Sequence, residues 1–294
     1  MKLSEIAKVA PIEVVADGEF HNLGFAKRRG TDLLMPLYSR RFKDVVLESP
    51  ALACLLTTPE LLDDMPDGLP VATSPDPLRH FFEIHMHLVD TPFYRDDQAT
   101  TIDPSAEIHR TAHVDETGVQ ISAKTVIGPH SVVLAGTSIG ADCRIGPNVT
   151  IGYEGFEIRD LGDRRLCIPH GGGVLIHDRV DIQANCSVAK SLFKDPTIIG
   201  ADTKIGHMAF VSHGVVVGRR CKIAAGATIS GSTVVGDDVW VGPNVQISNG
   251  LKIGDGAFLA IGAVVISDVE SGTRVAGNFA VDMRKFKAFM ASIQ

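Results

Sequence analysis

The chain has 294 residues, of which 45% are hydrophobic and 6% aromatic, and its formal net charge at pH 7 is −7. This length suffices for one large or two medium domains, and the acidic balance argues against nucleic acid or an anionic membrane as the main partner. No apolar run approaches the roughly 18 residues that a membrane span needs. The N-terminal segment lacks the apolar core and cleavage site of a signal peptide. We therefore expect a cytoplasmic protein without stable membrane insertion.

Residues 1–100 show no repeat and predict a small α/β domain. The segments IEVVAD, ALACLLTT and LPVATS are typical of strands, and LLMPLYSRRFKDVVLES combines a strand with a turn and a short helix. Asp76 and Pro77 form a helix start signal before LRHFFEIHMHLVD, in which apolar residues recur at helical spacing.

From residue 101 onwards, an aliphatic residue recurs at every sixth position. The clearest stretch is 199–270, with Ile199, Ile205, Val211, Val217, Ile223, Ile229, Val235, Val241, Ile247, Ile253, Leu259 and Val265. A helix would repeat at about 3.6 residues and a strand at 2, so neither explains this period. A hexapeptide repeat indicates a β-helix solenoid, in which three units close one coil of about 18 residues. Residues 18 apart should therefore stack on one another.

Two segments interrupt the period. Residues 153–173 are too long and too polar for one rung and predict a loop outside the coil, a place where functional residues often lie. The segment KSLFKDPT adds five residues before the repeat resumes at Ile199. The β-helix is expected to occupy residues 101–278, with residues 279–294 forming a short basic helix that caps its open end.

A solenoid of this kind is compatible with several classes of protein. A zinc-dependent hydratase would need three histidines on adjacent rungs. The positions 18 residues before and after His213 are Asp195 and Gly231, so no histidine stacks with it. His85 and His87 lie two residues apart on a helix and do not share a face. We expect no metal ion and no tightly bound cofactor.

The order of parts carries a narrower resemblance. It lies in IDPSAEIHRTAHV, then IGYEGFEIRDLGDRRLCIPHGGGVLI, then HDRVDIQANCSV, TIIGADTKIGHMAFVSHGVVVG and IAAGATISGST. Together these segments resemble the hexapeptide-repeat acyltransferases, in particular the UDP-3-O-acylglucosamine N-acyltransferases of lipid A biosynthesis. The resemblance implies a mainly β fold: a left-handed parallel β-helix with a small N-terminal α/β domain that binds uridine, and a C-terminal helix. It also implies a homotrimer with sites between neighbouring subunits.

The resemblance assigns two catalytic residues. The family's general base lies in a stretch of the form Ile-Ala-His-Asn, and His213 occupies that place in Val211-Ser212-His213-Gly214. A histidine suits the removal of a proton from a sugar amine that attacks a thioester, because its pKa is near 6.5. Gly231 matches the glycine whose N–H stabilises the oxyanion in this family, and glycine allows close approach of a ligand.

Further binding residues are expected on the same ground. Tyr38 and Phe42 are nearest to the aromatic pair that stacks on uracil, and Phe156, Glu157 and Arg159 are expected to contact the sugar nucleotide or the neighbouring subunit. His170 and His207 stand where the family has a glutamine and an asparagine. The C-terminal segment resembles that of sugar acetyltransferases, which implies that the pantetheine arm of the donor passes Asn249, Gly262 and Ala263 and that Arg274 meets the CoA phosphates.

The sequence thus predicts an N-acyltransferase of bacterial glycan or lipopolysaccharide biosynthesis. It would move an acyl group from acyl-CoA or an acyl carrier protein to the amine of a nucleotide-linked amino sugar. The family's second histidine is absent at Asn249-Gly250, which favours a relative in a glycan pathway over the lipid A enzyme proper, the alternative. UDP or dTDP, the amine position and the acyl length stay open. A non-catalytic solenoid for assembly or nucleotide-sugar binding is the alternative from another class.

Overall fold

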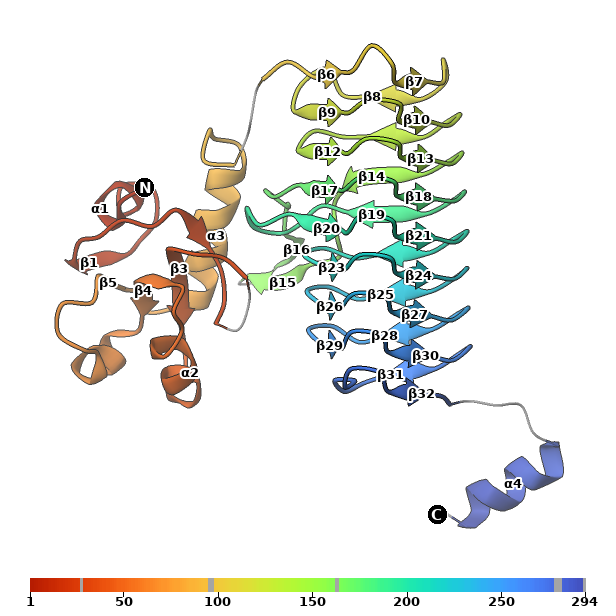
Figure 1. Cartoon of the computed structure of the whole chain (residues 1–294). Coiled ribbons are helices and arrows are strands. Elements are labelled where there is room, and N and C mark those ends of the chain that lie inside the picture. Colours follow the sequence, from red (N-terminus) through yellow and green to blue (C-terminus); the bar gives the residue numbers. More distant parts are fainter. Residues whose placement is uncertain (27–28, 95–97, 162–163, 278–281, 293–294) are drawn as a thin grey trace.

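The computed structural model describes residues 1–26, 29–94, 98–161, 164–277 and 282–292. It consists of an N-terminal α/β domain beside a long β-helix, followed by a C-terminal helix (Figure 1). No helix in these described ranges is long and apolar enough to cross a membrane.

The N-terminal domain is a five-stranded sheet with helices. Its strands have the order β1-β5-β4-β3-β2, and only β1 is antiparallel to its neighbour. The elements in chain order are α1 (Leu3–Ile6), β1 (Glu13–Ala16), β2 (Asn22–Leu23), β3 (Leu33–Leu37), the 3-10 helix η1 (Arg40–Phe42), α2 (Lys43–Leu47), β4 (Leu52–Thr57), the 3-10 helix η2 (Pro59–Asp64), β5 (Val71–Thr73) and α3 (Pro77–Val89). The predicted strands and the helix after Asp76 are therefore present.

Helix α3 begins where the sequence indicates. The Asp76 side chain accepts a hydrogen bond from the Arg79 N–H at 3.1 Å, and Pro77 occupies the first turn, where its missing N–H costs nothing. The helix buries the side chains of Phe81, Phe82, Ile84, His85 and Leu88, which pack against the sheet and the loops of the β-helix.

The repeat forms a three-sided β-helix with three sheets, and the strands within each sheet are parallel (Figure 1). Sheet 1 contains β6 (Thr101–Ile102), β9 (Val119–Ile121), β12 (Thr137–Ile139), β17 (Val174–Ile176), β20 (Thr197–Ile199), β23 (Val216–Val217), β26 (Val234–Val235) and β29 (Lys252–Ile253). Sheet 2 contains β7 (Glu107–Ile108), β10 (Val126–Ile127), β13 (Arg144–Ile145), β18 (Asp181–Ile182), β21 (Lys204–Ile205), β24 (Lys222–Ile223), β27 (Trp240–Val241), β30 (Phe258–Leu259) and β32 (Arg274–Val275). Sheet 3 contains β8 (His113–Val114), β11 (Val132–Val133), β14 (Thr150–Tyr153), β19 (Ser187–Ala189), β22 (Phe210–Val211), β25 (Thr228–Ile229), β28 (Gln246–Ile247) and β31 (Val264–Val265).

The aliphatic residue that recurs every six positions is the inward-facing residue of each short strand. Val211, Ile229 and Ile247 pair in successive coils of sheet 3, each 18 residues after the last, and are at most 1% exposed. Burial of this aliphatic column holds the coils together. The predicted parallel β-helix with a small N-terminal α/β part and a C-terminal helix is confirmed.

Both interruptions leave the β-helix at the same edge. Residues 154–173 and 190–196 connect sheet 3 to sheet 1 on two successive coils. The first was expected to be a loop, but it contains an antiparallel hairpin of β15 (Ile158–Leu161) and β16 (Arg164–Cys167). Backbone pairing within the hairpin satisfies polar groups that a bare loop would expose. We call the edge between sheets 3 and 1 the 3–1 corner.

The insertions dock the β-helix onto the N-terminal domain. Leu192 and Phe193 pack in the same apolar cluster as the aromatic side chains of α3. The buried His85 on α3 donates from Nε2 to the Pro169 carbonyl at 2.8 Å and accepts from the Tyr94 hydroxyl at 3.0 Å. These contacts fix the insertions against α3, which places them over the 3–1 corner.

The chain continues after β32 into α4 (Met283–Ser292). This helix lies within the predicted range 279–294, of which residues 279–281 and 293–294 fall outside the described part of the chain.

Candidate active site

His213 lies at the 3–1 corner, on the turn between β22 and β23. Its imidazole lies directly against Gly231 of the next coil, because a Cβ added to Gly231 would come within 2.6 Å of both Cε1 and Nε2. The Ser232 N–H donates to the His213 carbonyl at 2.9 Å, which continues the coil-to-coil ladder. In the described part of the chain, no protein group accepts a hydrogen bond from the Gly231 N–H. The structure thus brings the two expected catalytic residues together at the 18-residue spacing.

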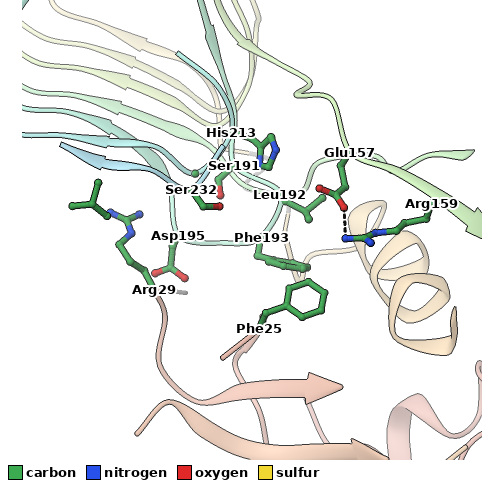
Figure 2. Close-up of a pocket in the computed structure, with 12 residues that line it drawn as sticks. Phe25, Arg29, Glu157, Arg159, Ser191, Leu192, Phe193, Asp195, His213 and Ser232 are labelled. Atoms are coloured by element: carbon green, nitrogen blue, oxygen red, sulfur yellow. Dashed lines mark ion pairs between the residues drawn. The ribbon is translucent and has the colours of Figure 1, made fainter. Parts of the chain in front are cut away.

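A pocket with a cavity volume of about 90 Å³, open to solvent, lies beside His213 between the β-helix and the N-terminal domain (Figure 2). Its lining residues come from both insertions, from the corner itself and from the loop after β2: Phe25, Arg29, Glu157, Arg159, Ser191, Leu192, Phe193, Asp195, His213, Gly214, Ser232 and Val234.

The hairpin supplies a charged wall to this pocket. The Arg159 guanidinium lies 2.6 Å from the Glu157 carboxylate and 4.7 Å from the centroid of the Phe82 ring. Figure 2 shows the pair on one side of the imidazole, with Arg29 and Asp195 on the other side. Two of the three loop residues expected to contact a sugar nucleotide therefore line the pocket, and the third, Phe156, is 79% exposed and does not.

The opposite wall of the pocket contains residues that the sequence did not predict. Arg29 donates to the Pro196 carbonyl at 2.6 Å, and the Asn22 amide donates to the Asp195 carboxylate at 2.8 Å. These residues are distant in sequence. The 18-residue spacing does not place Asp195 either, because the coil before His213 is 23 residues long, with Ser187 paired to Phe210.

His170 is close to the expected base but deeper. Its ring centroid lies 5.3 Å from that of His213, with 74° between the planes. It is 1% exposed, and burial, followed by the nearby His213, lowers the pKa of His170 to about 3. His170 is therefore neutral at physiological pH.

Three other expected acceptor-binding residues lie apart from this pocket. Tyr38 and Phe42 pack on each other in the N-terminal domain, with ring centroids 5.2 Å apart. His207 is exposed on the edge between sheets 2 and 3, one corner before His213.

The expected donor-binding residues lie on two different corners and one sheet of the last coils. Asn249 follows Gly231 on the 3–1 corner, where the Gly250 N–H donates to the Gly231 carbonyl at 2.9 Å. Gly262 and Ala263 lie on the same edge as His207. The Arg274 guanidinium lies 3.8 Å over the Phe258 ring on sheet 2. Only Asn249 is thus in line with His213.

No three His, Cys, Asp or Glu side chains in the described ranges converge on a point that could hold a metal ion.

Comparison with known proteins gives matches in the β-helix. The bacterial transferase hexapeptide family (six repeats) matches residues 118–153, 196–231 and 232–270. The UDP-3-O-acylglucosamine N-acyltransferase of Maricaulis maris is 38% identical over 106 residues, which is 36% of this chain and 30% of that protein. UDP-3-O-acylglucosamine N-acyltransferase 1 of Francisella tularensis subsp. tularensis is 38% identical over 105 residues, 35% of this chain and 30% of the relative. The chain therefore spans less than a third of the length of the curated relatives it matches.

Among solved structures, the UDP-N-acetylglucosamine acyltransferase from Campylobacter jejuni superposes with a TM-score of 0.50 at 20% identity, over 66% of this chain and 83% of that one. This likeness concerns the fold. Together the matches confirm the resemblance that the sequence indicates: the chain carries the bacterial transferase hexapeptide repeat on a left-handed β-helix similar to those of the acyltransferases.

Proposed function

We propose that the chain is an N-acyltransferase that moves an acyl group from a phosphopantetheine thioester to the amine of a nucleotide-linked amino sugar. The observation that carries this proposal is the imidazole of His213 held against Gly231 in a pocket with a charged wall. The printed names of the aligned relatives support the reaction class.

In the proposed reaction the amine nitrogen attacks the carbonyl carbon of the thioester. The C–N bond forms, the carbonyl oxygen gains negative charge, and His213 accepts the proton from the nitrogen. The Gly231 N–H would donate to the oxyanion, a contact that is stronger in the transition state than before it. When the C–S bond breaks, the imidazolium returns the proton to the leaving thiolate. The products are an amide and a free thiol, and the base is regenerated.

Glu157 and Arg159 would bind the acceptor. A carboxylate can accept hydrogen bonds from an amine or a sugar hydroxyl, and a guanidinium can bind a phosphate oxygen. The names of the relatives favour a UDP-linked glucosamine that already carries a 3-O-acyl group as one candidate acceptor. An amino sugar of another glycan pathway, linked to UDP or dTDP, is the other candidate, because Asn249-Gly250 replaces the family's second histidine.

The donor would be acyl-CoA or an acyl carrier protein, and the assembly a homotrimer in the cytoplasm. A donor arm between two subunits would reconcile the scattered positions of Gly262, Ala263 and Arg274, because a neighbour could bring them to a different His213. Tyr38 and Phe42 could contact a nucleotide in the same way. Mass measurement by light scattering during size exclusion tests the trimer.

The test of function measures thiol release from acyl-CoA and acyl carrier protein with UDP- and dTDP-linked 2-, 3- and 4-amino sugars. His213→Ala should lower kcat/KM by about 10²- to 10⁴-fold, the usual contribution of a general base. His109→Ala, at an exposed corner far along the β-helix, is the matched control. Full transfer by His213→Ala would contradict the mechanism. Absence of thiol release with every pair would favour the non-catalytic solenoid.

A further inference from the structure

His170 has an unused hydrogen-bonding atom at the centre of the molecule. Its Nδ1 lies 3.0 Å from the Ile168 carbonyl, and a carbonyl only accepts, so Nδ1 carries the hydrogen. The ring is neutral, which leaves a lone pair on Nε2. This Nε2 is buried and has no hydrogen-bond partner among the residues that the structure describes. Buried acceptors without a donor are rare in native proteins, so a donor should be close.

The His213 ring lies next to this Nε2. Gly155 of the long insertion lies against both rings: a Cβ added there would be 2.8 Å from His170 Nε2 and 2.7 Å from His213 Cδ2. The ring centroids are 5.3 Å apart. Two imidazoles joined by an N–H···N hydrogen bond of about 2.9 Å have centroids about 5.2 Å apart. The separation therefore fits a direct hydrogen bond between the rings.

The required donor follows from rotating the His213 ring by half a turn about its Cβ–Cγ bond. An imidazole has the same shape in both orientations, and the rotation exchanges Cδ2 with Nδ1 and Cε1 with Nε2. Nδ1 then occupies the edge that faces His170. Because Cε1 and Nε2 are equally distant from the Cβ position of Gly231, at 2.6 Å, a ring nitrogen stays beside Gly231 after the exchange.

We propose that His170 is a positioning residue for His213: His213 donates from Nδ1–H to Nε2 of His170 and thereby keeps its own Nε2 lone pair directed at Gly231. The chemical use of that lone pair rests on the function proposed above. A base in which the other ring nitrogen is held by a third group is a recurring arrangement in catalytic sites. Here the third group is neutral, so it fixes the tautomer without placing a negative charge beside the base.

The surroundings keep His170 in this role. Glu154 lies 3.7 Å from His170 Nδ1 and is itself 3.5 Å from Lys190. His213, Lys190 and His85 disfavour a positive charge on the His170 ring, and burial does so most strongly. When His213 accepts a proton during catalysis, His170 therefore remains an acceptor and does not take the proton away.

The inference is tested first without activity, by nitrogen NMR of the full chain labelled with ¹⁵N-histidine and assigned with His213→Gln. We expect neutral His213 to carry its hydrogen on Nδ1. A hydrogen on Nε2 of His213 in the wild-type protein would overturn the proposal. This readout is independent of acyl transfer, so it separates a failure here from a failure of the proposed function.

The second arm uses three variants. His170→Phe keeps a planar ring but removes the acceptor, and it should give a mixture of His213 tautomers. It should also lower kcat by about 10- to 100-fold with little change in KM and move the acidic limb of the pH–rate profile. His170→Gln supplies an amide oxygen and should restore most of kcat. Gly155→Ala inserts a methyl group between two intact imidazoles and should act like His170→Phe. An unchanged tautomer and pH profile in folded His170→Phe and Gly155→Ala would refute the positioning role.

Discussion

Replacing Gly231 by alanine should displace the proposed base while leaving the fold intact. The new Cβ would lie 2.6 Å from two atoms of the His213 ring, whereas ordinary contacts begin at 3.4 Å. The ring must therefore move by nearly an ångström or turn away, because the turn is fixed by the ladder bonds Ser232 to His213 and Gly250 to Gly231. A displacement of about 1 Å of a reacting group costs roughly 10²-fold in rate.

The same substitution should not destabilise the chain. Gly231 does not have a positive φ, so alanine fits the backbone and restricts the unfolded chain slightly, worth about 0.4–1 kcal/mol. We expect kcat/KM for thiol release to fall about 100-fold, with an unchanged or slightly higher melting temperature. Gly277→Ala is the matched control, because a Cβ there meets no described atom within 4 Å. Wild-type kinetics in Gly231→Ala would refute the idea that His213 works from the position it occupies.

Two further predictions concern binding and stability. Arg159→Ala should raise the KM for the nucleotide sugar about 10- to 100-fold, because a charge-assisted hydrogen bond contributes about 1.5–3 kcal/mol. The KM for the acyl donor should not change. Arg165→Ala removes the exposed ion pair with Asp160 on the same hairpin and should change neither KM. Burial lowers the pKa of His85 to about 4, against about 6.5 when unfolded. The unfolded chain then binds the extra proton, so the contribution of His85 to stability is full above pH 6.5 and falls by roughly 3 kcal/mol as the pH drops towards 4, in addition to the fall that the buried His170 causes. In urea titrations, His85→Phe should flatten this fall, and an equally steep fall in the variant would contradict the assignment.

The period of the sequence was sufficient to predict the β-helix, because every sixth side chain enters the interior and is aliphatic. Val211 and Ile229 show this directly: both are buried and paired across one coil. The contact of His213 with Gly231 followed from the same spacing. The spacing also explains the distant residues. His207 is six positions before His213, one corner away, and Gly262 is 54 positions after Met208, three whole coils along that other edge. Only the family resemblance placed these residues in the site.

The walls of the pocket could not be predicted, because the period is absent where the chain leaves the coil. The course of residues 154–173 and 190–196 is set by packing against α3, through contacts such as His85 with Pro169 and Phe193 with Phe81, whose ring centroids are 5.8 Å apart. Such contacts join residues about a hundred positions apart and leave no local pattern. Arg29 reaches the pocket for the same reason.

The position of the insertions suggests how the two substrates share the site. A corner of a β-helix can accept extra residues without breaking the ladder, since the strands on either side still pair with the next coil. Here the 3–1 corner carries a long insertion on one coil, a short one on the next and His213 on the third, after which Gly231 and Asn249 follow with no insertion. The insertions therefore cover His213 on the side of the preceding coils and leave it open on the side of the following coils. An acceptor held by Glu157 and Arg159 would fill the covered half, and the long arm of a thioester would then approach the carbonyl position from the side of Asn249. The order of the corners along one edge thus accounts both for a pocket beside His213 and for the direction from which the donor would arrive.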